Sequence, residues 1–180
     1  MLAGKGKVDK PFLFISVILI VAGFFIFSSA SLGLLAKESS NYSDVAFTQM
    51  ILGLFLGTVA MIVASRLDFK VWKRFAFWFF LFAIILNILV LIPGIGFEHG
   101  GARRWIRLGS LSFQPSEILK LAFVFYFAAW AASVKDRIKT FRSGLLPLLI
   151  LLGIISVLLL QQPDTDNLII IITAGVAMFV

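Results

Sequence analysis

Residues 101–120 read Gly-Ala-Arg-Arg-Trp-Ile-Arg-Leu-Gly-Ser-Leu-Ser-Phe-Gln-Pro-Ser-Glu-Ile-Leu-Lys, a polar segment between two long apolar runs. The segment holds three arginines, a tryptophan, a glutamate and a lysine. Charged groups are costly beside a lipid bilayer, so a cluster this dense needs a functional or structural reason. We expect the arginines in a short polar loop, and Glu117 and Lys120 at the start of the helix that follows.

Composition indicates an integral membrane protein. The 180 residues are 61% hydrophobic and 14% charged, with a mean hydropathy of +1.05, more apolar sequence than a water-soluble core of this size needs. Cysteine is absent, which excludes a disulfide framework and thiolate metal sites. The single histidine, His99, excludes multi-histidine zinc chemistry. We attribute the net charge of +7 to basic residues that flank membrane spans, and expect no nucleic-acid partner.

The apolar runs predict an all-α polytopic membrane fold. Runs of continuous apolar sequence, without the alternation of barrel strands, predict helices. The first five are near the roughly 20 residues that cross a bilayer, and the sixth is shorter. We take the first as a retained span, too long for the apolar part of a signal peptide. The runs fall at about residues 12–35, 45–64, 75–95, 118–134, 145–160 and 168–180.

Basic residues alternate between connections and predict the orientation. The N-terminus, the second connection and the fourth connection together carry eleven of the sixteen lysines and arginines. By the positive-inside rule the N-terminus is cytoplasmic. The segments 37–44, 94–114 and 161–167 then lie on the outer face.

Two helix starts on that face share a pattern, Gln114-Pro-Ser-Glu117 and Gln162-Pro-Asp-Thr-Asp166. Proline suits the first helical turn, and acids there meet the partial positive charge of the helix N-terminus. Helix-start chemistry alone is one interpretation. Glu117 and Lys120 share a helix face, with Lys120 roughly 4.5 Å deeper, which predicts a buried ion pair that is functional, orients the helix or snorkels to the interface.

The arginines break the positive-inside trend. Guanidinium groups of Arg103, Arg104 and Arg107 suit a lipid pyrophosphate, with anionic head groups as the alternative. Trp105 is either an interfacial anchor or a surface for stacking on a sugar ring. Asn87, inside the third run, is expected to make a hydrogen bond between helices.

The acids also raise the question of a metal. Asp164 and Asp166, with Glu117, are candidate ligands for Mg²⁺ or Mn²⁺, with capping as the alternative role. No organic cofactor is expected, because the chain lacks a phosphate-cradling glycine loop. The full set of candidate substrate-binding residues is Arg103, Arg104, Trp105, Arg107, Gln114, Ser116, Gln162 and Asp164.

Taken together, these motifs resemble the SEDS family of FtsW, RodA and SpoVE. The resemblance rests on Gly101-Ala-Arg-Arg-Trp-Ile followed by Leu-Gly, on Phe113-Gln-Pro-Ser-Glu-Ile-Leu-Lys, on Gln161-Gln-Pro-Asp and on the run 27–31, Phe-Ser-Ser-Ala-Ser. The double arginine before Trp105 favours the division-type FtsW branch.

The resemblance implies a ten-helix inner-membrane glycosyltransferase, of which residues 1–180 form the N-terminal part of one domain. Such enzymes polymerise lipid II on the outer face during division or elongation, with a class B penicillin-binding protein and other divisome or elongasome components. The family's Glu and Lys match Glu117 and Lys120, in a supporting role. The family's catalytic base is expected beyond Val180, so the catalytic residue of this fragment is unknown and the fragment alone should be inactive.

One position departs from the family. After Gln-Pro-Asp the family usually has an apolar residue, Gly and Thr, whereas this chain has Thr165, Asp166 and Asn167. The departure puts a metal or substrate role for this turn in doubt. Two other functions stay open: a lipid II flippase, and a non-catalytic scaffold that would use small-residue faces such as Gly53 and Gly57.

Overall fold

The computed structural model describes the backbone of residues 9–35, 41–99, 101–108, 111–134, 137–138 and 140–179. Within these ranges, the side chains of residues 30–35, 41–52, 99, 108 and 111 are not described. The chain divides into two compact units, Met1–Asp68 and Phe69–Val180, and each is treated by itself.

The first unit consists of two helices, α1 (Lys10–Leu35) and α2 (Asn41–Arg66), which contact each other. Asp9 is the N-cap of α1, because its Oδ1 accepts a hydrogen bond from the backbone N–H of Phe12 at 3.1 Å. Helix α1 contains the predicted run 12–35 and begins before it. Helix α2 contains the predicted run 45–64 and extends beyond it at both ends.

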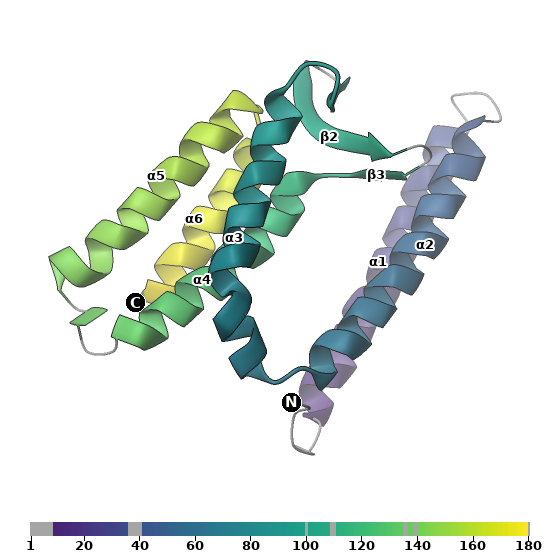
Figure 1. Ribbon diagram of the computed structural model, residues 1–180. Helices are drawn as coiled ribbons and strands as arrows, with labels where there is room; N and C mark the ends of the chain where they lie inside the picture. The colour runs from purple at the N-terminus through teal and green to yellow at the C-terminus, as the bar shows by residue number, and fades with distance from the viewer. Residues whose placement is uncertain are drawn as a thin grey trace. The chain divides into compact units, whose positions relative to one another are not determined.

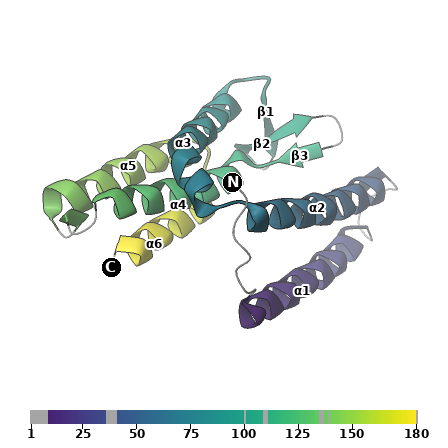
Figure 2. The ribbon, with the colours of Figure 1, turned by 60° about the horizontal axis from the view of Figure 1, so that its bottom comes forward.

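The second unit has four long helices and a small sheet (Figure 1). Helix α3 runs alongside α4, and α6 packs against both α4 and α5, as two views of the ribbon show (Figures 1 and 2). In chain order the elements are α3 (Phe69–Leu91), β1 (Gly96–His99), β2 (Ala102–Leu108), β3 (Leu111–Phe113), α4 (Pro115–Val134), η2 (Phe141–Leu145), α5 (Leu146–Gln161) and α6 (Thr165–Phe179).

An apolar core joins these four helices. Phe123 and Phe127 of α4 are fully buried and stack with ring centroids 5.7 Å apart. Gly175 of α6 lies against the Phe123 ring, where a Cβ would come within 3.1 Å of Cζ. A small residue there allows α6 to approach α4 closely. The core therefore fixes the helix ends that carry the polar residues described below.

Four helical segments are long and apolar enough to cross a membrane, among the described residues. The second predicted span is represented by the shorter apolar stretch Gly53–Arg66, because side chains before Gly53 lie outside the described set, and the sixth by Thr165–Phe179. The four long segments are Lys10–Ser29, Phe69–Leu91, Pro115–Val134 and Phe141–Gln161.

One predicted boundary is wrong. The third run was expected to reach Ile95, but α3 ends at Leu91, because Pro93 follows and Gly94 adopts a φ of +93°. The fifth run, predicted at about 145–160, agrees with α5 to within one residue, and the π-helical turn η2 precedes it. Its widened turn is closed by the Leu146 N–H, which donates to the Phe141 carbonyl.

The segment after α3 is a three-stranded antiparallel sheet in the order β1-β2-β3, where the sequence predicted only a polar loop in an all-α fold. Gly101, with a φ of +78°, lies in the turn between β1 and β2. Glycine is also required at position 96, where a Cβ would lie 2.0 Å from the Val90 carbonyl oxygen. The sheet is thus folded back onto the end of α3.

Candidate functional site

Strand β2 divides the charged residues of the predicted loop between two faces. Ala102 and Ile106 are 6% and 8% exposed, and β2 contacts α3 and α4. Arg104 is on the side of Asp164, since the two side chains lie within ion-pair distance. The pairing of β1 with β2 shifts between Phe97 and Glu98 and skips Arg104. Trp105 and Arg103 are therefore the partners of neighbouring β1 residues, whose side chains point to opposite faces of the sheet.

Arg103 and Arg107 are both positioned by side chains of β1. Arg103 pairs across the strands with Glu98, and its Nε donates to Glu98 Oε2 at 2.9 Å. Arg107 lies over the ring of Phe97, with Cζ 3.5 Å from the ring centroid. Trp105 is the cross-strand partner of Phe97 and is 37% exposed. Strand β1 therefore orders the guanidinium groups of Arg103 and Arg107.

The two helix starts meet at a buried carboxylate. Asp164 is 1% exposed, and its Oδ2 accepts hydrogen bonds from Gln114 Nε2 at 2.8 Å and from Ser116 Oγ at 2.6 Å. Asn167 Nδ2 donates to Oδ1 at 3.1 Å and to Oδ2 at 2.9 Å, and to Ser116 Oγ at 3.0 Å. We call Gln114, Ser116, Asp164 and Asn167 the Asp164 cluster. It ties the start of α4 to the start of α6.

Arg104 connects the sheet to this cluster. Its Nη1 lies 4.0 Å from Asp164 Oδ1, at the outer limit of an ion pair, and its side chain is 33% exposed. A buried carboxylate is stable only when charge and hydrogen bonds compensate for lost water, and Arg104 supplies the charge. The structure therefore separates the three arginines that the sequence grouped, with Arg104 alone facing Asp164.

A second buried contact holds the turn between α5 and α6 against α3. Gln162, which is fully buried, donates from Nε2 to the Asn87 backbone oxygen at 3.0 Å and to Asn87 Oδ1 at 3.4 Å. Asn87 itself donates to the Ala83 carbonyl at 2.8 Å. The predicted hydrogen bond between helices at Asn87 is thus confirmed, and it anchors the residue two places before Asp164. Within the described residues, Gln162 Oε1 is a buried side-chain acceptor that lacks a partner.

Glu117 and Lys120 form the predicted pair, with Lys120 Nζ 2.9 Å from Glu117 Oε1. The expectation that the pair is buried is wrong for this chain, since the side chains are 57% exposed for Glu117 and 23% for Lys120. Glu117 is in the first turn of α4, so its carboxylate points out from a helix end while Lys120 lies one turn further along. Both side chains are accessible to a ligand.

The predicted metal ligands do not assemble. Asp166 is exposed, whereas Asp164 is buried with donors on both oxygens. Among the described residues, no three His, Asp or Glu side chains lie close enough together to hold a metal ion. The described residues therefore form no cation site by themselves, and Mg²⁺ or Mn²⁺ stays a prediction.

Three participants were missed by the sequence analysis. Asn167 stood out only as a departure from a family pattern, yet it donates to both oxygens of Asp164. Its position three residues after Asp164 on a helix start was a usable signal. Phe97 and Glu98 gave no signal without the register of the sheet, because their partners lie across a turn.

These features define a class, the multi-pass helical membrane proteins that carry a polar site at the mouths of their helices. Residues 10–180 match the family FTSW_RODA_SPOVE, described as cell cycle protein. The chain belongs to this family of FtsW, RodA and SpoVE, as the motifs predicted.

Curated relatives agree. The chain is 40% identical over 159 residues to a probable peptidoglycan glycosyltransferase FtsW of Trichlorobacter lovleyi, covering 87% of the chain and 41% of the relative. It is 35% identical over 170 residues to the protein of the same name in Geobacter sp., covering 94% and 46%. The chain thus spans less than half the length of these relatives.

Solved structures share the fold. A chain from a study titled "Structural coordination of polymerization and crosslinking by a peptidoglycan synthase complex" matches with a TM-score of 0.66 and 25% identity, covering 87% of this chain and 44% of that one. The rod shape determining protein RodA of Thermus thermophilus matches with a TM-score of 0.61 and 26% identity, covering 87% and 49%. The family and the apolar helices together indicate a multi-pass protein of the inner membrane.

Proposed function

We propose that the protein that carries this chain is a peptidoglycan glycosyltransferase that polymerises lipid II on the outer face of the cytoplasmic membrane. The names of the FtsW relatives support this activity. The single observation that carries the role of this chain is the Asp164 cluster, which locks two helix starts together beneath Arg104. Arg104 of the sheet faces Asp164, and Lys120 lies one turn along α4 from Ser116 of the cluster.

The chemistry requires two functions. A sugar hydroxyl loses its proton and attacks an anomeric carbon, while the lipid pyrophosphate departs with its negative charge. Arg104 and Lys120 suit the second function, because cations that are already in place stabilise charge as it develops on the leaving group. Arg103, Arg107 and Trp105 of the same strand suit binding of the lipid-linked substrate before reaction.

Asp164 is unsuited to act as the general base. Both of its oxygens accept hydrogen bonds from side chains of the same cluster, and the residue is 1% exposed. A base needs a free lone pair within hydrogen-bond reach of the substrate hydroxyl. We therefore assign Asp164 a positioning role and place the base in a part of the protein outside this chain.

The test is glycan polymerisation from labelled lipid II by the purified protein with its natural partner, for which we propose a class B penicillin-binding protein. Lys120→Ala and Arg104→Ala should each lower the rate at least about 100-fold, the typical effect of removing one transition-state donor. Lys73→Ala, at the opposite end of α3, is the matched loss of one exposed charge and should leave the rate unchanged.

The same variants separate the alternatives. A flippase would show lipid II translocation in vesicles that falls with Lys120→Ala while polymerisation is absent from the wild type. A scaffold would bind its partner, and neither alanine variant would weaken that binding. Wild-type polymerisation rates in both Lys120→Ala and Arg104→Ala would overturn the proposed role of this site.

A further inference from the structure

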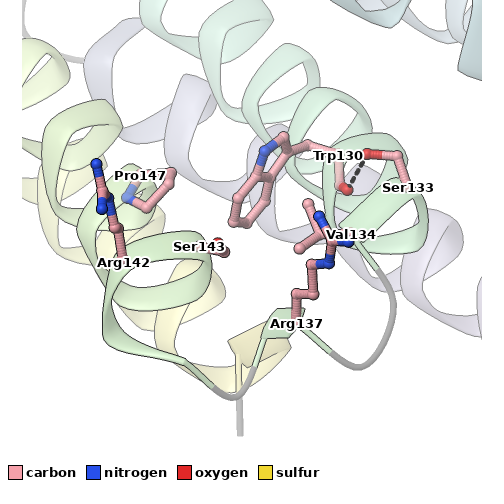
Figure 3. A pocket seen from close by; sticks show the side chains of 7 residues that line it. All are labelled: Trp130, Ser133, Val134, Arg137, Arg142, Ser143 and Pro147. Atoms are coloured by element: carbon pink, nitrogen blue, oxygen red, sulfur yellow. Dashed lines mark hydrogen bonds between the residues drawn. The ribbon is translucent and has the colours of Figure 1, made fainter.

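A polar cavity lies at the end of α4 that is away from the sheet. It has a volume of about 440 Å³ and is lined by three segments: the end of α4, the connection that follows, and the turn η2 with the start of α5. Figure 3 shows the indole of Trp130 directed from α4 into the space between these segments. The lining residues are Trp130, Ser133, Val134, Arg137, Arg142, Ser143 and Pro147.

The fold builds this cavity with a close backbone contact. Thr140 caps the π-helical turn η2: its Oγ1 accepts from the Ser143 N–H at 3.3 Å and donates to the Arg137 carbonyl at 2.8 Å. A Cβ on Gly144 would lie 1.7 Å from the Ile138 carbonyl oxygen, so only glycine permits the approach. These contacts hold Arg137 and Arg142 on either side of one tight corner.

The charges of Arg137 and Arg142 are not neutralised by a carboxylate of the described residues. Within the described part of the chain, neither Arg137 nor Arg142 has a carboxylate within ion-pair distance. The neighbouring Asp136 is outside the described residues. Arg137 and Arg142 lie on opposite sides of Trp130 (Figure 3), and their guanidinium groups suit phosphate oxygens. The Ser133 hydroxyl already donates to the Trp130 carbonyl at 2.6 Å, so the arginines carry the recognition. The apolar rim of Trp130, Val134 and Pro147 suits the hydrocarbon next to such a group.

We propose that this cavity binds the phosphate group of an anionic ligand, with the headgroup of a phospholipid of the adjacent leaflet as the natural source. Basic pockets between membrane helices take such headgroups because charge, hydrogen bonding and the lipid boundary coincide there. The site is separate from the Asp164 cluster, since it lies at the opposite end of α4. Its occupancy would brace the α4–α5 corner rather than take part in the reaction.

Binding is measured on the whole protein in detergent, by native mass spectrometry with phosphatidylglycerol and with phosphatidylcholine. The wild type should retain phosphatidylglycerol preferentially. Arg137→Ala/Arg142→Ala should weaken that retention about tenfold or more, through loss of two charge-assisted contacts. Arg66→Ala/Lys73→Ala, which removes two positive charges elsewhere, should not. A second variant, Arg137→Lys/Arg142→Lys, keeps the charge, and intermediate retention would support guanidinium recognition of the phosphate.

The same binding measurements distinguish a phospholipid headgroup from a soluble phosphate ligand. Competition by inorganic phosphate at millimolar concentration, with phosphatidylglycerol and phosphatidylcholine retained equally, identifies a soluble phosphate ligand in the same site. Equal loss of retention in the two alanine double variants would overturn the proposal, because the effect would then be general surface charge. Unchanged retention in Arg137→Ala/Arg142→Ala, with a folded protein by size-exclusion chromatography, would overturn it as well.

Discussion

At the residue scale, stability should depend on the carboxylate of Asp164. Asp164→Ala removes the acceptor of the Gln114 amide and the buried Ser116 hydroxyl, and leaves the buried Asn167 amide only Ser116 Oγ as an acceptor. Breaking a buried, charged hydrogen-bond network by removing one member costs roughly 3 kcal/mol. We expect a clearly lower thermal midpoint for the purified protein in detergent, followed by fluorescence.

Asp166→Ala is the matched control, because Asp166 is an acid two residues away on the same helix start but is exposed. Its effect should stay within about 0.5 kcal/mol, as for surface substitutions in general. Equal midpoints for Asp164→Ala and Asp166→Ala would show that the cluster does not stabilise the fold.

At the element scale, helices were far easier to predict than the sheet. Continuous apolar runs identify α3, α4 and α5, because a helix that crosses the lipid must be apolar along its whole length. In β2 the alternation is interrupted where its pairing with β1 shifts, and Arg104, which faces the buried Asp164, is as polar as its neighbours. The pairing of Glu98 with Arg103 depends on the register of a glycine turn, which no local pattern encodes.

The same argument explains what was foreseen of the site. The repeated Gln-Pro pattern correctly brought Gln114 and Asp164 to one end of the helices, because both precede helix starts on the same predicted face. Their direct hydrogen bond, and the part played by Asn167, depend on how α4 and α6 pack around Phe123 and Gly175. That packing is a tertiary property, so the sequence could propose the neighbours but not the contacts.

The corner between α4 and α5 provides an element-scale prediction. Gly144→Ala should destabilise the protein by several kcal/mol or open the corner, because the added Cβ meets the Ile138 carbonyl oxygen and backbone has little room to move. Gly153→Ala, inside α5, meets nothing within 4 Å and should be neutral or stabilising by about 0.5–1 kcal/mol. Thermal midpoints of the two variants in detergent provide the measurement, and a Gly144→Ala midpoint at or above that of Gly153→Ala would contradict the prediction.

At the scale of the whole molecule, the proposed orientation predicts which end of the second unit is reached from outside the cell. This chain contains no cysteine, so a single introduced thiol reports its own position. Asp166→Cys lies at the start of α6. Lys73→Cys lies near the start of α3, and the sheet follows the opposite end of α3. Both positions are exposed. A membrane-impermeant maleimide should label Asp166→Cys in intact spheroplasts and label Lys73→Cys only after permeabilisation, because the basic connections are retained on the cytoplasmic side. The protein without an introduced thiol gives the background. The reverse labelling pattern would place the Asp164 cluster on the cytoplasmic side, where it could not serve polymerisation on the outer face.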